Sequence, residues 1–385
     1  MMNLLNLSLN SGVKMIAEIK ESIERDLTNK GNKTYPNYVH MGAAIDWLLY
    51  AQKVTNTGGF SSAYSLYLGW RDPFPETTGY IIPTLLNIYN QSGEKALLES
   101  ALKAGNWLVS IQNDNGYFFE PHKRDPMVYD SGQVIFGFIS LYTFTKEEKF
   151  LKSAIKSADW IVDVQEEDGS WKKFAFNNIP HTYYSRVSWA LLELYKITNF
   201  DNYKKSAIKQ LKWVLENQAS NGWYNKASFF KDNKPVLHTI AYTIDGLWEC
   251  GRILNNSSLM NSAKKAADVL LLLSERDGII SGYYSNWKSI TGHKCLTGLS
   301  QMSIIWLNLF LYTKDTRYLN QALLTNNFVK SRQIIQTNHK NLYGALASSY
   351  PIWGNYMPFN YLNWAVKFFL DSLILENNIQ AQQGG

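Results

Sequence analysis

The chain has 385 residues, of which 45% are hydrophobic and 14% aromatic, so it can bury a large core. The formal net charge of +6 is modest and no Lys/Arg tract stands out, which argues against a nucleic-acid partner. No run approaches the ~18 consecutive apolar residues that a transmembrane helix needs, so we expect no membrane span.

In chain order, segments with the helical spacing of apolar residues alternate with polar connections. Two helices and the long loop between them make one unit, and a short turn leads to the next unit. Six such units follow one another. Helices are predicted over residues 40–54, 78–89, 94–112, 130–143, 147–165, 183–197, 202–218, 239–254, 259–274, 296–312, 316–335 and 361–375.

The two helices of a unit differ in character. The first carries Lys, Glu and Asp on one face, as in 149–163, which is typical of an outer helix. The second is apolar nearly all round, as in 134–139 and 302–307, and should be buried. Six outer and six inner helices predict an all-α fold, the (α/α)6 toroid, in which a double ring of six helical hairpins closes on itself. We expect this catalytic domain over residues 38–377, an N-terminal lead-in over 1–37 and a C-terminal tail over 378–385.

The long loops all join an outer to an inner helix, so they should gather at one end of the ring. The inner helices begin at the same end, and their free N–H groups and dipoles suit anions. Two of these helix starts are alike, because His181 and His238 are each followed within four residues by a tyrosine, Tyr184 and Tyr242. We therefore predict the functional site at this end.

The two cysteines, Cys250 and Cys295, have neither a disulfide framework nor metal-ligand spacing. The first 30 residues lack the basic start, continuous apolar core and cleavage site of a signal peptide. We expect a cytoplasmic protein with no cofactor and no metal, because no His/Asp/Glu cluster has ligand spacing. The sequence does not specify the oligomeric state.

A repeated motif carries a family resemblance. Residues 165–171, Gln-Glu-Glu-Asp-Gly-Ser-Trp, are similar to the QxxDGSW repeat of terpene cyclases and prenyltransferases, and weaker copies lie at 112–117 and 218–223. Over 38–377 the chain resembles the six-hairpin (α/α)6-toroid superfamily, which includes glycoside hydrolases, polysaccharide lyases and sugar epimerases. Segments 74–80, 180–186 and 351–354 resemble terpene cyclase-like proteins found with bacterial surface-polysaccharide genes. The resemblance implies a toroid in carbohydrate metabolism, such as polysaccharide biosynthesis, and leaves the reaction open.

Isoprenoid chemistry is the weaker reading of this motif. Terpene cyclases of this shape carry an acidic DxDD motif, which the sequence lacks. Residues 293–300 are faintly similar to part of the zinc site of protein prenyltransferases, but no matching Asp or second His accompanies them. We interpret the repeat as a structural turn, with Gly169 at the bend and Trp171 packed beneath it, and keep an isoprenoid-binding protein as an alternative.

Proton abstraction from a uronic acid, by a lyase or C5-epimerase, is the leading hypothesis. It needs a base, a proton donor and a group that neutralises the substrate carboxylate. We assign His181 and Tyr184 as the acid/base groups. Arg186 and His238 are the expected carboxylate binders, and Tyr242 is a second proton carrier.

A glycoside hydrolase is the main alternative. Such enzymes use two carboxyl groups that flank the glycosidic bond. Glu76 and Asp130 are the candidates, although Asp130 could instead cap its helix, and Asp245 is a poorer one. A non-catalytic glycan-binding protein on the same fold is a further alternative.

The expected substrate is an anionic, uronate-containing bacterial oligosaccharide or polysaccharide. Loop aromatics offer flat apolar faces on which sugar rings stack, and the inner-helix starts supply polar partners. The predicted substrate-binding residues are Trp70, Tyr80, Tyr129, Gln133, Trp171, Trp223, Trp353 and Asn363.

Overall fold

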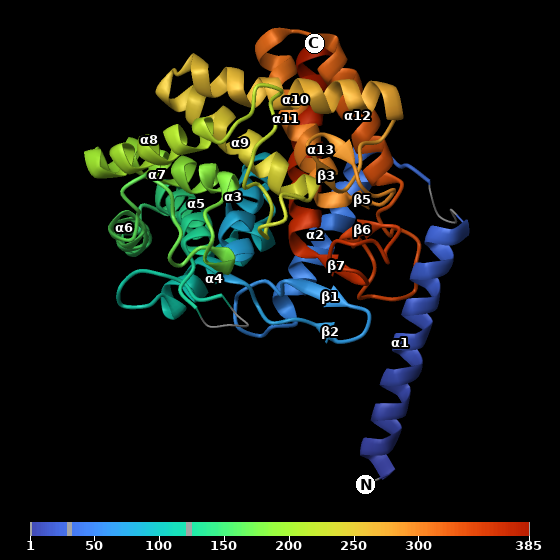
Figure 1. Cartoon of the computed structure of the whole chain (residues 1–385). Helices are drawn as coiled ribbons and strands as arrows, with labels where there is room; N and C mark the ends of the chain where they lie inside the picture. Colours follow the sequence, from blue (N-terminus) through green and yellow to red (C-terminus); the bar gives the residue numbers. More distant parts are fainter. Residues whose placement is uncertain (1, 29–32, 121–124, 385) are drawn as a thin grey trace.

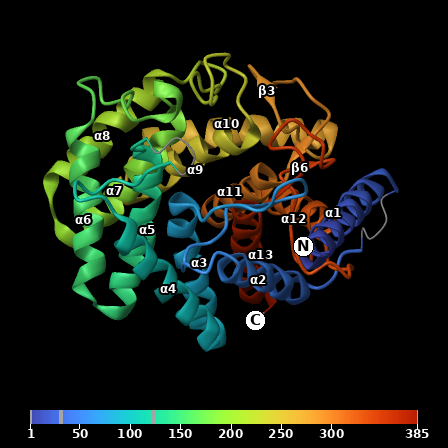
Figure 2. The same ribbon diagram turned by 90° about the horizontal axis from the view of Figure 1, so that it is seen from below.

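Two concentric rings of helices make up the body of the protein in the computed structural model, which describes residues 2–28, 33–120 and 125–384 (Figure 1, Figure 2). The inner ring consists of α3 (Pro75–Ser92), α5 (Val128–Thr145), α7 (Ser185–Thr198), α9 (Leu237–Leu254), α11 (Leu296–Thr313) and α13 (Asn363–Gly384). The outer ring consists of α2 (Asn37–Lys53), α4 (Lys95–Ile111), α6 (Glu148–Asp163), α8 (Asp201–Glu216), α10 (Ser257–Asp277) and α12 (Thr316–Lys330). The predicted all-α (α/α)6 toroid is confirmed.

Packing pairs the helices differently from the predicted units. Each of the first five inner helices packs against the outer helix that follows it across a short turn, whereas the long loop spans to the next pair. The turns are tight because the residue after each of these five helices, such as Gly93 or Asn199, adopts the left-handed conformation that ends a helix. The first outer helix, α2, packs against the last inner helix, α13, and α13 also contacts α3, so both rings close.

Short strands tie the loops together at the end where the inner helices begin. β1 (Ala63–Ser65) lies between β2 (Gly69–Trp70) and β7 (Asn360–Leu362), which joins the first long loop to the last. Two further pairs are β3 (Tyr284–Ser285) with β4 (Lys288–Ser289), and β5 (Lys294–Cys295) with β6 (Ser349–Tyr350). Each strand has two or three residues, so they fasten loops and build no sheet core.

The repeated Gln-x-x-x-Gly motif is a latch between neighbouring outer helices. The Gln165 side-chain amide donates to the carbonyl oxygen of Gly169 (2.9 Å) in its own turn and to that of Ser206 (3.0 Å) on α8. Gly169 has φ +89°, and a Cβ there would lie 2.6 Å from the Lys209 carbonyl carbon, so glycine is required. The predicted turn is confirmed, with Trp171 buried beneath it. The same two kinds of bond are made by Gln52, Gln112, Gln218 and Gln333.

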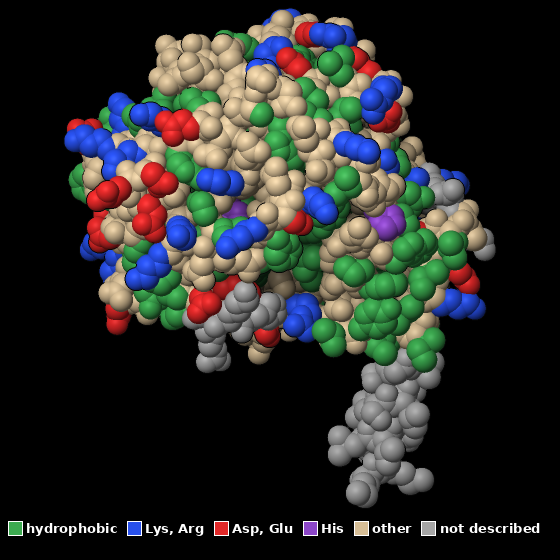
Figure 3. All heavy atoms as spheres, viewed as in Figure 1, with side chains coloured by type: hydrophobic (Ala, Val, Ile, Leu, Met, Phe, Trp, Pro, Cys, Tyr) green, Lys and Arg blue, Asp and Glu red, His purple; other side chains and the backbone are tan. Residues whose placement is uncertain are grey.

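The N-terminal segment is a helix, α1 (Met2–Thr28), whose second half is fastened to the loop end of the ring (Figure 1). Ser22 accepts a hydrogen bond from the Tyr361 hydroxyl (2.7 Å), and Asp26 accepts one from the Ile352 N–H (2.6 Å). Glu18 is buried and accepts from the Tyr64 hydroxyl. Beside α1, hydrophobic side chains gather on the surface over the loops that carry β6 and β7 (Figure 3).

The predicted helices agree with the observed ones in number, order and type within the ring, with ends that differ by a few residues. The predicted tail is different, because α13 continues as one helix through Gly384. Within the described residues, no helix is long and apolar enough to cross a membrane.

We expect Gln165→Ala to destabilise the protein by about 2 kcal/mol, because two buried carbonyl oxygens each lose a hydrogen bond worth about 1 kcal/mol. Urea unfolding followed by circular dichroism measures this difference. Glu167→Ala, at an exposed position of the same turn, is the matched control. Equal urea midpoints for the two variants would contradict the stabilising role of the Gln165 hydrogen bonds.

Candidate functional site

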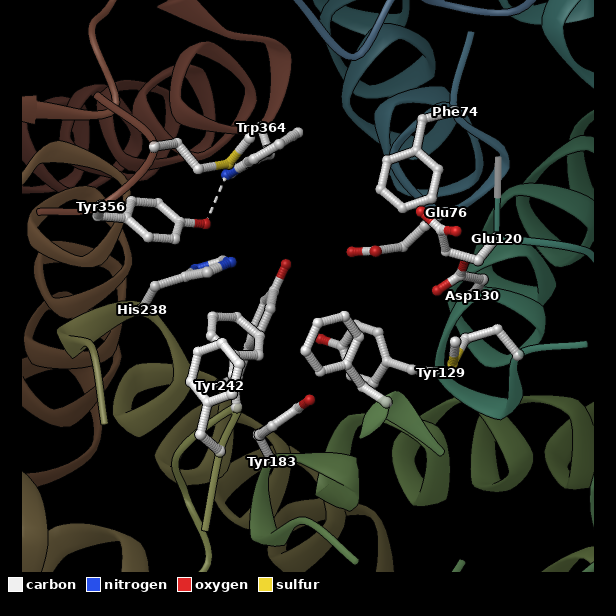
Figure 4. A pocket seen from close by; sticks show the side chains of 15 residues that line it. Phe74, Glu76, Glu120, Tyr129, Asp130, Tyr183, His238, Tyr242, Tyr356 and Trp364 are labelled. Carbon is white, nitrogen blue, oxygen red and sulfur yellow. Dashed lines mark hydrogen bonds between the residues drawn. The ribbon is translucent and has the colours of Figure 1, made fainter. Parts of the chain in front are cut away.

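A cavity of about 320 Å³ opens at the loop end of the ring, above the starts of the inner helices (Figure 4). Helices α3, α5, α9 and α13 and the five loops that precede α3, α5, α7, α9 and α13 form its wall. Its apolar and aromatic lining is interrupted by three carboxyl groups and one imidazole. The lining residues are Phe74, Glu76, Glu120, Met127, Tyr129, Asp130, Phe176, Tyr183, Phe229, Phe230, His238, Tyr242, Tyr356, Met357 and Trp364.

In most inner helices, the second residue lines the cavity. All six inner helices begin at the same end of the ring, so equivalent residues in their first turns lie at similar depth. Four of the six second residues line the cavity: Glu76, Tyr129, His238 and Trp364. The other two, Arg186 and Thr297, are buried beside it.

Glu76 and Asp130 lie on the same wall of the cavity, at the starts of the neighbouring helices α3 and α5 (Figure 4). Burial raises the pKa of Glu76 to about 8, against the opposing effect of the nearby Arg186 charge. Burial, and then the charge of Glu76, raise the pKa of Asp130 well above its usual value. Asp130 is the third residue of α5 and does not cap it, since the N-cap is Met127. This pair therefore retains a proton at neutral pH.

His238 faces the carboxyl groups from the opposite side of the cavity (Figure 4). Its Nδ1 lies 2.8 Å from the Gln301 side-chain oxygen, so this nitrogen carries the proton and Nε2 has a free lone pair. Burial lowers the pKa of His238 to about 3, which keeps the ring neutral. The hydroxyl groups of Tyr129 and Tyr242 and one oxygen of Asp130 are buried without a hydrogen-bond partner among the described residues. These polar atoms are available to a ligand.

Arg186 lies beneath the cavity and does not line it. Its guanidinium forms a buried ion pair with Asp245 and donates to the Gln133 side-chain oxygen (3.1 Å). The charge also lies 4.8 Å from the centre of the Tyr242 ring. Arg186 therefore acts on the cavity through its field, and its guanidinium is already engaged by protein groups.

His181 and Tyr184 lie outside the cavity lining, although the sequence predicts them as its acid/base groups. The two ring nitrogens of His181 lie 3.0 Å and 2.8 Å from the carbonyl oxygens of Ser228 and Phe176. The Tyr184 hydroxyl accepts from the Phe176 N–H (3.0 Å). Both side chains thus connect loops, and the neighbouring Tyr183 occupies the cavity wall instead.

The predicted substrate-binding residues divide into two groups. Tyr129 lines the cavity, and Tyr80 and Gln133, one helical turn below the second-residue layer, are buried under it. Asn363 is buried at the start of α13 and donates to Thr77 and to the Ser61 carbonyl, which closes the ring. The predicted tryptophans, Trp70, Trp171, Trp223 and Trp353, lie outside the cavity lining.

Burial explains why two of these tryptophans are not sugar platforms in this structure. Trp171 and Trp223 are 1% and 2% exposed, so neither presents a face to a ligand. Trp70 packs against Trp47 and Tyr64, with ring centres 5.2 Å and 5.1 Å apart. Apart from Tyr129 and Tyr242, the phenyl, phenol and indole rings that line the cavity belong to residues that the prediction did not include.

Sequence reasoning missed Tyr183, Trp364 and the phenylalanines of the cavity. Trp364 is the second residue of its inner helix, so the same position as Glu76 and His238 would have indicated it. The phenylalanines lie on long loops, whose course has no periodic signal. Among the described residues, no group of three or more His, Cys, Asp or Glu is placed to hold a metal ion.

Comparison with known proteins supports the same architecture. A family model described as the ulvan lyase N-terminal domain matches residues 128–298, from the start of α5 to the first turn of α11. A comparison with curated proteins finds no match.

Solved structures match over most of the chain. An unsaturated glucuronyl hydrolase specific for heparin has a TM-score of 0.70 and 15% identity, covering 89% of this chain and 97% of its own. The unsaturated glucuronyl hydrolase from Bacillus sp. GL1 has a TM-score of 0.70 and 14% identity, with 88% and 96% covered. Cellobiose 2-epimerase from Spirochaeta thermophila DSM 6192 has a TM-score of 0.68 and 13% identity, with 95% and 98% covered. The chain thus has the (α/α)6-toroid fold of these solved structures.

We expect the stability gained by Glu76→Gln to increase with pH. The folded protein keeps the Glu76 proton up to about pH 8, whereas the unfolded chain releases it near ~4.3. Between these values the folded state binds more protons, so a rise in pH destabilises the wild type through this group. Glutamine carries no such proton.

Thermal unfolding of both proteins from pH 5 to pH 9 measures this effect. The unfolding temperature of the surface variant Glu167→Gln should change with pH as that of the wild type does. If the unfolding temperature of Glu76→Gln also changed with pH as that of the wild type does, the raised pKa of Glu76 would be contradicted.

Proposed function

We propose that this protein is a carbohydrate-active enzyme that acts on a uronate-containing glycan, with Glu76 and Asp130 as its acid–base pair. The observation that carries the proposal is the placement of two buried carboxyl groups with raised pKa on one wall of a cavity. Hydrolysis of a glycosidic bond needs one carboxyl group that donates a proton and one that accepts a proton from water.

The pair meets this need as a unit. Because the charge of Glu76 adds to the effect of burial on Asp130, the two carboxyl groups lose their protons in separate steps, so Glu76 is ionised while Asp130 is still protonated. The protonated member donates to the oxygen of the leaving sugar, and the ionised member receives a proton from the attacking water. The apolar lining excludes other water from the bond that breaks.

Recognition of a uronate relies on neutral donors and on one buried charge. No Lys or Arg lines the cavity among the described residues, but the Arg186 charge lies under the Tyr242 ring. The free hydroxyl groups of Tyr129 and Tyr242 can donate to a carboxylate in the field of that charge. The matched ulvan lyase domain and the glucuronyl hydrolases of the same fold support this substrate class.

The size of the cavity favours reaction at the end of a sugar chain. Its volume of about 320 Å³ is near the lower limit of the ~300–1,000 Å³ typical of small-molecule sites. A pocket of this size, closed below by Arg186 and Asp245, suits a terminal residue and has no room for a polymer to pass through.

Lyase or C5-epimerase chemistry is a second candidate, supported by His238 and Tyr242. Their ring centres lie 4.2 Å apart. The free Nε2 belongs to a neutral imidazole, and the Tyr242 hydroxyl has no hydrogen-bond partner among the described residues. A neutral histidine is a base that can remove the C5 proton, and a tyrosine can return or donate one. The ulvan lyase match includes both residues.

We expect Glu76→Gln and Asp130→Asn each to lower kcat by roughly 10²–10⁴-fold on a uronate-terminated oligosaccharide, the usual contribution of general acid–base catalysis. New reducing ends without ultraviolet absorption identify hydrolysis. An unsaturated product, or deuterium incorporation at C5 without cleavage, identifies the lyase or epimerase instead.

Two control variants sharpen this experiment. Glu193→Gln changes a carboxyl group on inner helix α7 that bonds Trp189 and Lys196 away from the cavity, and should keep the wild-type rate. Tyr184→Phe should lower the midpoint of thermal unfolding and change kcat little, because the Tyr184 hydroxyl accepts a hydrogen bond from the Phe176 N–H of a loop. Full activity of both Glu76→Gln and Asp130→Asn would refute the carboxyl pair.

A further inference from the structure

A second cavity of about 370 Å³ lies next to the first and shares Phe230 with it. It is formed by residues 179–180 before the start of α7 and by the loop that leads into α9. Its lining residues are Ile179, Pro180, Asn225, Lys226, Phe230, Lys231 and Asn233. Phe230 therefore forms part of the wall of both cavities.

The loop that forms this second cavity is held by the segment that precedes α7. The Thr182 N–H donates to the Lys226 carbonyl (3.1 Å), and the Asn177 side chain donates to the Phe229 carbonyl (3.0 Å). The His181 ring contributes the third contact, at the Ser228 carbonyl. A site held this way is largely formed before a ligand binds.

The two cavities differ in charge. Glu76, Glu120 and Asp130 line the first, whereas the charged residues that line the second are Lys226 and Lys231. Asp232 lies on the same loop, but one of its oxygens accepts from the Ser228 hydroxyl (2.7 Å) and the Lys234 N–H (3.1 Å). The second cavity therefore favours an anion.

Polar atoms and an apolar face complete the second cavity. The Asn233 side-chain oxygen is buried without a hydrogen-bond partner among the described residues, so it can accept from a sugar hydroxyl. Phe230 is 61% exposed and presents an apolar ring between the two cavities. An aromatic face, an amide oxygen and two ammonium groups are the partners of an acidic sugar.

We propose that this second cavity binds the sugar next to the terminal one and selects a residue that carries a carboxylate or sulfate, through Lys226 and Lys231. The inference rests on the proposed function, because it takes the first cavity as the place of the terminal sugar. It extends that function by assigning the acidic preference to the penultimate residue of the chain.

Calorimetric titration with three disaccharides tests the proposal. Each has glucuronate at its non-reducing end, followed by glucuronate, by glucose, or by sulfated glucose. The Glu76→Gln variant is the background, so that no probe is consumed. We expect tighter binding of at least one acidic probe than of the glucose probe, and comparison of the two acidic probes identifies the preferred anion.

Lysine variants locate this preference. Lys226→Gln and Lys231→Gln should each weaken binding of the preferred acidic probe about two- to five-fold, as expected for partly exposed ion pairs, and leave the glucose probe unchanged. The effect should shrink from 50 to 500 mM salt. Lys234→Gln, on the same loop but outside both cavities, is the matched control and should change nothing.

The outcomes separate this proposal from the proposed reaction. Equal binding of all three probes, an equal loss for acidic and neutral probes, or the same loss with Lys234→Gln would overturn the second site. If the wild type hydrolyses the probes but the lysine variants bind them as the wild type does, only the second-site proposal is refuted. If the lysine variants lose the preference for an acidic probe but the wild type converts none of the probes, the second site is supported and the proposed reaction is refuted.

Discussion

The guanidinium of Arg186 is a buried positive charge that links the helices at the centre of the ring. It joins three successive inner helices, because Gln133 lies on α5, Arg186 on α7 and Asp245 on α9. Burial alone would lower the pKa of Arg186, but Asp245 and the surrounding phenols raise it above its usual value, so the charge persists. That charge opposes the effect of burial on Glu76 and adds to the effect of burial on His238. One ion pair thus supports both the packing of the inner ring and the electrostatics of the cavity.

The toroid explains why such groups are found at one end. Each inner helix is enclosed by two inner neighbours and an outer helix, so most of its length is apolar and a charged group inside it, such as Asp245, is paired. Only the beginning of the helix meets the loops, and there a polar side chain can reach a cavity in place of solvent. The same enclosure removes water from Glu76 and Asp130, and it is this loss of water that raises the pKa of each carboxyl group.

Two residues with catalytic chemistry have structural places in this fold. His181 and Tyr184 bond the backbone of the loops around the cavity, which orients Phe176 and the loop that bears Phe229 and Phe230. The aromatic wall of the first cavity and the lysines of the second therefore depend on the segment that begins α7. Fold and site are connected here by side-chain contacts with backbone N–H and carbonyl groups, and the side chains that make them stay outside both cavities.

The sequence by itself determined the helices, their alternation between outer and inner rings, and the end at which the loops gather, because each follows from local periodicity and from loop length. It also singled out Glu76, Asp130, His238 and Tyr242, which the structure brings to one cavity. Only the tertiary structure decided that Arg186 lies under this cavity and that Trp223 is buried. The rotation of a helix about its axis, and the course of a long loop, are set by neighbours distant in the chain. A local pattern therefore indicates that a side chain lies near the site, while packing decides whether it points into the cavity or into the wall.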